Sequence, residues 1–346
     1  MKVWNFGIVG AGVIGDFHAR AIADLENGNL YAVCDTNFDR AKGLAEKYNC
    51  KAYDSYEQML KEKEIDIVTI ATPSGLHMEP TVAAAKARKH VLCEKPLDVT
   101  IERIDKMIAA HEEADTKLGG IFQARFADSL VPLRNAIKAG RFGTITYAGV
   151  YVPWWRTQEY YSNTWHGTWE LDGGGALMNQ SIHAIDMLCE MMPAEVESVL
   201  SFSSKIGHDD IETEDTSVAA LKFSNGALGV IYGSTAAFPG RARRFEITGT
   251  KGSVVYEADR IVFWQFDEEL GEDENIRKQF NSSNRADGSS DPKAISHVLH
   301  TRNFAEFIKS IETGEEFCLS PQQARKSVAL IIDIYKSSME NNKNDY

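Results

Sequence analysis

The first third of the chain repeats one pattern of apolar and polar residues. Short, continuous apolar segments alternate with longer stretches in which apolar residues recur three or four positions apart. The first pattern is typical of strands buried on both faces, and the second is typical of amphipathic helices. We expect strands at 3–9, 30–34, 65–71, 90–93 and 117–122, and helices running to about residue 26 and at 37–48, 55–63, 77–88 and 101–114. Because parallel neighbours need long crossovers, residues 1–122 are predicted to form a doubly wound α/β domain whose parallel sheet is covered on both faces.

The pattern changes after residue 122. The next elements are expected as a helix at 129–139, a strand at 144–152 and, behind an aromatic loop and three glycines, a helix at 176–191. From about 196 to 264 the chain is strand-rich, with tight turns such as Ser224-Asn225-Gly226 that are typical of hairpins. Residues 123–346 are therefore predicted to form a second domain built on a largely antiparallel sheet.

The end of this second segment has three parts. Residues 267–274 contain six acidic residues and 281–292 are rich in Ser, Asn, Asp and Gly, so we expect a solvated, mobile excursion without catalytic residues. A helix is expected at 295–312. Ser320-Pro321 is typical of a helix start, and a last helix is expected at about 321–340, with packing against the first domain as one option.

Composition excludes several classes of function. The 346 residues carry 37 Lys and Arg against 50 Asp and Glu, and the net charge of -13 would repel nucleic acid and anionic membranes. No apolar run approaches the roughly 20 residues of a bilayer span, and the N-terminal residues lack a secretory signal, so we expect a cytoplasmic protein. The five cysteines include no CxxC pair, and His297 and His300 are read as a polar helix start, so neither a disulfide framework nor a metal site is predicted.

A glycine motif, GxGxxG, directly follows the first strand. Gly10, Gly12 and Gly15, with Val13 and Ile14 between them, open the first helix, and Asp35 ends the second strand. This arrangement lets backbone approach a pyrophosphate at a helix N-terminus, while the carboxylate binds the adenosine ribose. A purely structural turn is the alternative. Asp35 would repel a 2′-phosphate, and the next residues, Thr36 and Asn37, supply no Arg to hold one, so NAD is favoured over NADP.

Two further segments lie at the predicted carboxyl ends of strands, where open parallel sheets bind their ligands. The first is Thr72-Pro73-Ser74 with His77, and the second is Glu94-Lys95-Pro96. We predict that both line the cofactor crevice and that Lys95 stands near the nicotinamide. An ordinary solvated lysine is the alternative interpretation of Lys95.

These motifs together resemble the glucose-fructose oxidoreductase and inositol dehydrogenase (Gfo/Idh/MocA) family. The resemblance covers nearly the whole chain and includes the glycine motif with His18, Ala71-Thr72-Pro73-Ser74 with His77, Glu94-Lys95-Pro96, Gly173-Gly174-Gly175 followed by Asn179, His183 and Asp186, and Thr248-Gly249-Thr250-Lys251-Gly252. It implies an N-terminal Rossmann domain, a C-terminal α/β domain with a large open mostly antiparallel sheet, and hydride transfer between a nicotinamide and a sugar or polyol carbon.

The resemblance also implies site residues. It assigns catalysis to Lys95 and His183, beside the reacting hydroxyl. Many relatives have Asp where this chain has Asn179, and because an amide cannot act as a base, Asn179 is expected only to orient substrate. His183 and Asp186 are three apart on one helix, so they either contact each other or have different partners. A histidine that only stabilises the helix is the alternative for His183.

The loop at 151–169 is unusually aromatic. We expect Arg156, Tyr161, Trp165 and His166 to contact substrate, because aromatic faces stack on sugars and Arg and His bind hydroxyl or acidic groups. An aromatic mini-core or a subunit interface is the alternative for each of these residues.

The sequence thus predicts an NAD-dependent oxidoreductase acting on a secondary alcohol or ketone of a sugar, polyol or glycoside. One alternative is a tightly bound NAD used for transient oxidation in epimerase, lyase or glycosidase chemistry, and another is a non-catalytic NAD- or sugar-sensing protein. A large sheet with helices on only one face leaves its other face exposed, so we also expect a homodimer or homotetramer.

Overall fold

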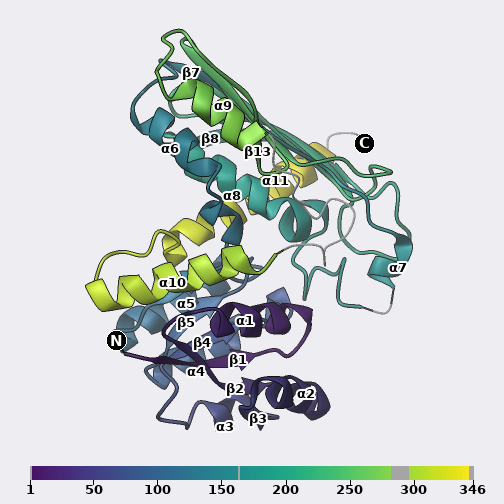
Figure 1. The fold of residues 1–346 in the computed structure, drawn as a ribbon. Helices are drawn as coiled ribbons and strands as arrows, with labels where there is room; N and C mark the ends of the chain where they lie inside the picture. The colour runs from purple at the N-terminus through teal and green to yellow at the C-terminus, as the bar shows by residue number, and fades with distance from the viewer. Residues whose placement is uncertain (1, 163, 282–295, 343–346) are drawn as a thin grey trace. The chain divides into compact units, whose positions relative to one another are not determined.

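The computed structural model describes residues 2–162, 164–281 and 296–342 (Figure 1). Contacts within the chain divide it into two compact units, which are described separately here. The first consists of Met1–Ala124, Glu170–Gly173 and Ser296–Arg325, and the second of Arg125–Trp169, Gly174–Ile295 and Lys326–Tyr346. The first unit therefore includes a segment from the last sixth of the chain.

The first unit contains a parallel sheet of six described strands in the order β3-β2-β1-β4-β5-β6, which confirms the doubly wound prediction. The strands are β1 (Trp4–Val9), β2 (Gly28–Cys34), β3 (Lys51–Tyr53), β4 (Ile67–Ile70), β5 (His90–Cys93) and β6 (Leu118–Gly120). Its helices are α1 (Val13–Ala23), α2 (Phe38–Tyr48), α3 (Tyr56–Met59), η1 (Ser74–Leu76), α4 (Met78–Lys86), α5 (Ile101–Ala114) and α10 (Val298–Thr313).

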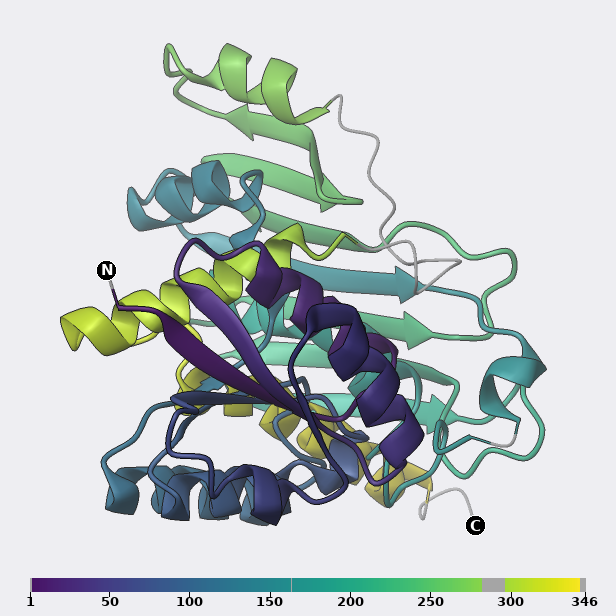
Figure 2. The same ribbon diagram turned by 60° about the horizontal axis from the view of Figure 1, so that its bottom comes forward.

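The strand order fixes which helices cover which face. Strands β1, β2 and β3 step in one direction across the sheet and β4, β5 and β6 step in the other, so right-handed crossovers place α1 and α2 on one face and α4 and α5 on the opposite face (Figure 2). Helix α10 packs beside α1, where the ring of Phe304 stacks on Phe6 from β1 at 5.9 Å. A helix from residues 298–313 thus completes the covering of the N-terminal strands.

Two short elements differ from the sequence-based expectation. Strand β3 was not predicted, because its three residues include an exposed lysine and show no buried alternation. The helix expected at 55–63 is confined to Tyr56–Met59, where the Ser55 side chain accepts a hydrogen bond from the Gln58 N–H at 3.3 Å.

The second unit contains a sheet of seven described strands in the order β13-β12-β11-β7-β10-β9-β8. Only the β7–β10 pair among them is parallel, so the mostly antiparallel prediction is confirmed. The strands are β7 (Ile145–Pro153), β8 (Val196–Ser204), β9 (Thr216–Phe223), β10 (Leu228–Ser234), β11 (Arg244–Gly249), β12 (Gly252–Glu257) and β13 (Arg260–Phe266). Its helical elements are α6 (Leu130–Lys138), α7 (Gln158–Tyr161), the π-helical turn η3 (Ala176–Ser181), α8 (Ile182–Met191), α9 (Asp273–Asn281) and most of α11 (Pro321–Asn342).

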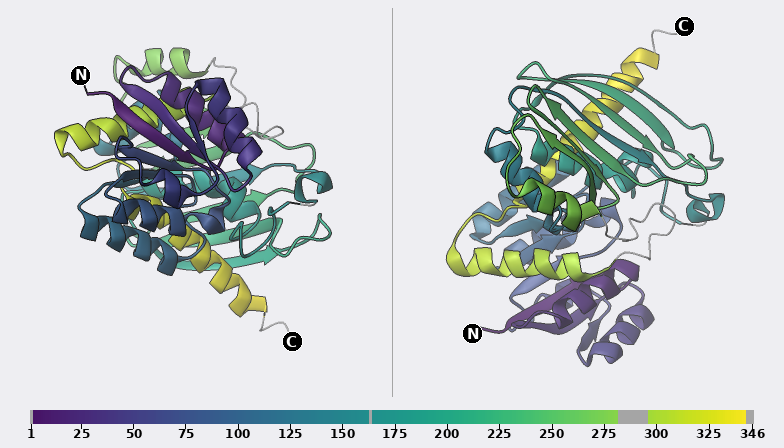
Figure 3. Two further views of the ribbon diagram at one scale, coloured as in Figure 1. Left: turned by 90° about the horizontal axis from the view of Figure 1, so that it is seen from below. Right: turned by 45° about the horizontal axis from the view of Figure 1, so that its top comes forward.

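The helices of this unit cover one face of the sheet, as the two views in Figure 3 show for α8 and α11. Side chains on β9 alternate between buried and exposed, as expected for a sheet with one packed face. The opposite face carries apolar residues in register: Leu200, Phe202, Val218 and Leu228 are each 48–59% exposed, and Phe202 pairs with Val218. Within the described part of the chain, nothing covers this apolar face of the sheet.

The acidic segment after β13 is mostly exposed, as predicted, but residues 273–281 form the helix α9, which corrects the expectation of an irregular excursion. Asp273 is buried at the start of α9, where the Arg141 guanidinium and the Trp264 indole N–H donate hydrogen bonds to its carboxylate. These partners compensate the buried charge, so the helix packs on the sheet. The remainder of the predicted excursion, residues 282–292, lies outside the described residues.

Among the described residues, none of the helices is both long enough and apolar enough to span a membrane.

Candidate active site

The glycine motif forms a tight turn between β1 and α1. Gly10 has φ +104°, and a Cβ there would overlap the carbonyl group of Ala71, while a Cβ on Gly15 would overlap the carbonyl oxygen of Gly10. By contrast, a Cβ on Gly12 would meet no atom within 4 Å. Gly10 and Gly15 are thus required by close backbone packing, whereas Gly12 leaves open space at the start of the helix.

That open space has the properties of an anion site. No side chain caps the N-terminus of α1, so its first N–H groups are available to a phosphate and the helix dipole favours negative charge. Val13 and Ile14, in the first turn, are 56% and 41% exposed, although both are apolar. A bound dinucleotide would cover these side chains, as the sequence predicts.

Asp35 lies at the end of β2, beside the glycine turn. Its Oδ2 accepts a hydrogen bond from the Ala11 N–H at 2.8 Å, and its Oδ1 accepts one from the Asn37 N–H at 2.8 Å. These bonds fix the carboxylate against the turn and leave each oxygen a lone pair for a ribose hydroxyl. The negative charge at this position also disfavours a 2′-phosphate.

His77 connects the loops that follow β4 and β5. Its Nε2 lies 2.9 Å from the carbonyl oxygen of Thr72, and its Nδ1 lies 2.8 Å from that of Pro96. The ring is buried, and both of its nitrogens are occupied by backbone. The structure therefore places His77 where it holds the predicted cofactor loops Thr72-Pro73-Ser74 and Glu94-Lys95-Pro96 together.

Glu94 is a buried carboxylate with partners on both oxygens. Oε1 lies 3.0 Å from His18 Nε2 and 3.6 Å from His300 Nε2, and Oε2 accepts a hydrogen bond from the Lys95 N–H at 3.0 Å. Thr69 Oγ1 lies 2.7 Å from the other nitrogen of His18. Burial raises the pKa of Glu94, but hydrogen bonds from His18 and His300 outweigh it and hold that pKa well below its usual range. The ionised Glu94 thus fixes the backbone of Lys95.

The group formed by His18, Glu94 and His300 also has the composition of a metal site, with its ligand atoms within 4.8 Å of one another. The hydrogen bond between His18 and Glu94 and the close approach of His300 to the same carboxylate oxygen account for this geometry. His300 was set aside with His297 in the sequence as part of a polar helix start. That interpretation fits His297, which contacts Asp24 at 2.7 Å, but His300 is buried beside Glu94. In the sequence, the four-residue spacing between His300 and the apolar Phe304 could have indicated that His300 lies on the buried face of the helix.

In the second unit, the predicted substrate residues Asn179 and His166 are brought together. Asn179 Nδ2 lies 3.5 Å from His166 Nδ1, and the His166 ring stacks on Tyr160 at 4.5 Å. Gln180 donates hydrogen bonds to the Tyr160 hydroxyl at 3.0 Å and to the Asn179 side-chain oxygen. Sequence reasoning missed Gln180, because nothing local shows that it connects the helix to the aromatic loop.

Arg156 and Tyr161 lie in the core of the aromatic loop. The Arg156 guanidinium donates to Gln180 Oε1 at 2.8 Å and lies over the ring of Trp154 at 5.1 Å, and the residue is almost fully buried. The buried Tyr161 donates its hydroxyl proton to Thr235 Oγ1 at 2.9 Å. Trp165, which packs on His166 with ring centroids 4.0 Å apart, is only half-buried. The first two residues therefore build the loop, and their predicted substrate contacts remain predictions.

His183 is half-buried on α8, four residues after Asn179. Asp186 is buried and accepts two hydrogen bonds from Arg125, at 2.6 and 2.7 Å. The sequence left open whether Asp186 contacts His183 or has a different partner. In the structure, Asp186 has Arg125 as a partner.

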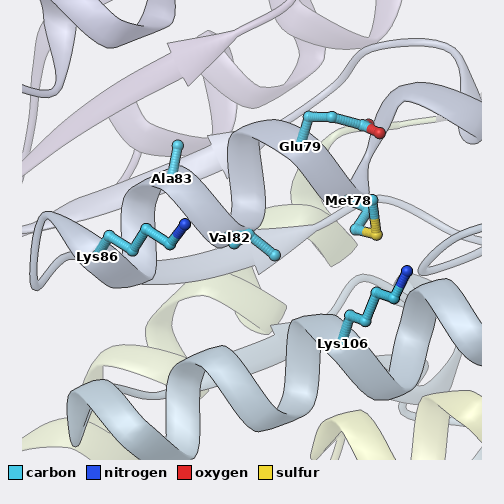
Figure 4. Close-up of a pocket in the computed structure, with 6 residues that line it drawn as sticks. All are labelled: Met78, Glu79, Val82, Ala83, Lys86 and Lys106. Atoms are coloured by element: carbon cyan, nitrogen blue, oxygen red, sulfur yellow. The ribbon is translucent and has the colours of Figure 1, made fainter.

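In the first unit, a groove of about 410 Å³ lies between α4 and α5 (Figure 4). It is lined by Met78, Glu79, Val82, Ala83, Lys86 and Lys106. None of the predicted site residues lines it.

Two family models match the chain in succession. The model described as "Oxidoreductase family, NAD-binding Rossmann fold" matches residues 4–120, and the model described as "GFO/IDH/MocA C-terminal domain" matches residues 131–255. Both halves of the resemblance seen in the sequence are thus found independently.

Individual proteins match over nearly the whole chain. It is 29% identical over 335 residues to the myo-inositol 2-dehydrogenase of Thermotoga maritima, covering 94% of this chain and 93% of that protein. It is 31% identical to the WlbA dehydrogenase of Bordetella pertussis, solved in complex with NADH and UDP-GlcNAcA, with a TM-score of 0.89 and coverage of 98% and 96%. The WlbA dehydrogenase of Chromobacterium violaceum, solved with the same two ligands, is 30% identical with a TM-score of 0.88 and coverage of 99% and 95%.

Proposed function

The chain belongs to the Gfo/Idh/MocA family of NAD-binding oxidoreductases, and from this premise we propose that it is an NAD-dependent dehydrogenase acting on a secondary alcohol or ketone of a sugar, polyol or glycoside. The observation that carries the proposal is the glycine turn, where Asp35 is bonded to Ala11 beside the open space at Gly12.

The residues present fit NAD. The N–H groups of the first turn of α1 would hold the pyrophosphate, and Asp35 would accept hydrogen bonds from the adenosine ribose. Thr72, Pro73 and Ser74 would line the crevice at the end of β4, with His77 holding their loop. Bound NAD supplies the hydride acceptor when an alcohol is oxidised.

Side chains of the protein would accept the hydroxyl proton of the substrate. Oxidation of a secondary alcohol requires the hydroxyl proton to leave as hydride leaves the same carbon. A histidine imidazole ordinarily exchanges protons near neutral pH, so His183 is assigned as the proton acceptor. Lys95 would stabilise the developing alkoxide charge, and its backbone is held by Glu94.

The substrate class is proposed from the relatives and the second unit together. One relative carries the name of an inositol dehydrogenase, and two solved relatives bind UDP-GlcNAcA. Asn179 and His166 offer a donor and acceptor pair for ring hydroxyls, and Trp165 offers an apolar face for sugar C–H groups. A hydroxylated six-membered ring satisfies both kinds of contact.

A substrate panel tests this proposal. Purified protein is mixed with NAD and, in separate reactions, with myo-inositol, UDP-GlcNAcA, free aldoses, alditols and methyl glycosides, and reduced nicotinamide is followed by absorbance. Saturable formation of NADH with one class supports the proposal. Substrate consumption without net NADH, with NAD retained through purification, would identify transient oxidation instead. Binding of NAD without turnover of any compound would indicate a sensing protein.

A further inference from the structure

The helix that carries Asn179 and His183 begins in an unusual way. A Cβ on Gly175 would overlap the carbonyl oxygen of Glu214, and a Cβ on Gly174 would overlap the hydroxyl of Tyr335. Only glycine therefore lets this backbone approach the segment before β9 and the helix α11. The two glycines bring the helix start into direct contact with one buried acidic residue.

Glu214 binds three successive N–H groups at that start. Its Oε2 accepts from Gly175 at 3.0 Å, its backbone oxygen accepts from Ala176 at 3.1 Å, and its Oε1 accepts from Leu177 at 2.8 Å. A helix leaves four such groups without partners inside the helix. One residue, distant in sequence, thus satisfies most of the N-terminus of the helix.

We propose that Glu214 is a positioning residue, which fixes the first turn of the helix so that Asn179 and His183 are presented to the substrate. The proposal rests on the proposed function, because it assigns those two side chains to the reaction. Glu214 itself contacts backbone and Tyr335, so it acts through the helix and is not a catalytic group.

The local helix geometry explains why the helix needs such a restraint. Residues 176–181 form a π-helical turn, which has looser hydrogen bonding than an α-helix and occurs frequently at functional sites. The Asn179 N–H reaches back to the Gly175 oxygen at 3.2 Å, so a shift of Gly175 moves Asn179 directly. His183 lies one turn further on the same side of the helix and moves with it.

Side-chain contacts add to the restraint. The Tyr335 hydroxyl donates to Glu214 Oε1 at 2.8 Å, and the Trp169 ring packs edge-on against Tyr335 at 5.4 Å. The end of the aromatic loop therefore contacts the same cluster. Burial raises the pKa of Glu214 to about 7, which shows how strongly the site isolates this group from water.

The substitution Glu214→Gln tests the proposal. It keeps the size of the side chain but places an amide NH₂ against an N–H donor, so the helix start must shift. Misplacement of a catalytic group by about 1 Å costs up to about 100-fold in rate, so we expect kcat to fall by about 10- to 100-fold while the Kd for NAD stays unchanged. Tyr335→Phe keeps both backbone bonds to the carboxylate, and a smaller loss is expected.

Asp273→Asn is the matched control. Asp273 is also a buried carboxylate in the same unit, and it accepts a hydrogen bond from the Leu270 N–H at 2.7 Å near the start of α9. Its loss should lower stability without changing the kcat of the folded protein. Equal loss of kcat in both variants would overturn the proposal, and so would wild-type kcat in folded Glu214→Gln.

A spectroscopic measurement separates this inference from the proposed function. The imidazole carbon-bound protons of the protein are recorded by NMR, and His183 is assigned with His183→Asn. We expect the His183 signal to move in Glu214→Gln and not in Asp273→Asn. If the wild type oxidises no compound of the panel, the proposed function fails, yet this signal still reports the positioning. An unmoved His183 signal in Glu214→Gln would overturn the inference even in an active enzyme.

Discussion

The raised pKa of Glu214 has a measurable effect on stability. Burial raises the pKa from an ordinary value of 4.5 to about 7, against the opposing effect of hydrogen bonds from Leu177, Tyr335 and Gly175, all of which are neutral donors. The folded carboxyl thus binds its proton more tightly than the unfolded one. Its contribution to stability is complete below about pH 4.5 and is lost as the pH rises through 7.

The size of the effect follows from the same two values. A rise of the pKa from 4.5 to about 7 corresponds to about 3 kcal/mol of stability, most of which is lost between pH 5 and pH 8. Glutamine does not titrate, so the wild type should lose most of this stability relative to Glu214→Gln over that interval. Subtracting the two proteins cancels the other titrating groups.

Urea unfolding measures this difference. Trp4 is the only tryptophan of the sequence outside the second unit, so tryptophan fluorescence reports mainly on the unit that contains Glu214. Tyr335→Phe retains the carboxylate and should retain the pH dependence. A wild-type minus Glu214→Gln difference that stays constant within about 0.5 kcal/mol from pH 5 to pH 8 would refute the reasoning.

Further predictions concern the cofactor, the reaction and the assembly. Asp35→Ser should narrow the preference for NAD over NADP, because it removes both the ribose hydrogen bonds and the repulsion of a 2′-phosphate; a wild type that already uses NADP as efficiently in steady-state kinetics contradicts this role. His183→Ala should lower kcat by about 10²- to 10⁴-fold with little change in NAD affinity, and near-wild-type turnover would move the base elsewhere. Lys95→Ala should lower kcat at least as much and weaken NAD binding modestly, as measured by titration calorimetry. Asn179→Asp should partly restore the turnover of a His183→Ala protein if a carboxylate at that position can accept the proton. The protein should be a homo-oligomer by light scattering at micromolar concentration, and Phe202→Glu, on the uncovered sheet face, should lower its mass; a monomeric wild type would contradict pairing through this face.

The sequence was most informative where the proposed function depends on the local conformation of the backbone. The strand, glycine turn and helix around Gly12 were predictable because GxGxxG encodes a conformation and a close approach within a few residues. The helix over 101–114 was predicted to the residue, since Thr100 caps its first turn and Asp115 ends it in the left-handed conformation. Such features need no knowledge of distant contacts.

Sequence reasoning failed where function depends on contacts between distant segments. Glu214 precedes an ordinary alternating strand, and nothing near it indicates that its carboxylate binds a helix start almost 40 positions earlier. His300 carried a partial signal, because Phe304 and Phe307 lie on the same side of its helix, yet its partner Glu94 is over 200 residues away. In a sequence, an isolated acidic residue is interpreted as exposed to solvent. Only the three-dimensional structure shows that Glu94 and Glu214 are buried.

The two buried carboxylates, Glu94 and Glu214, make the same kind of contact with the backbone. Glu94 accepts the N–H of Lys95, and Glu214 accepts the N–H groups that start the helix of Asn179 and His183, so each assigned catalytic side chain is held through its backbone. Each carboxylate also has a partner from the last fifty residues: His300 on α10 for Glu94, and Tyr335 on α11 for Glu214. The C-terminal helices thus each contact one of the two carboxylates, and damage to α11 should lower turnover before it abolishes NAD binding at the glycine turn.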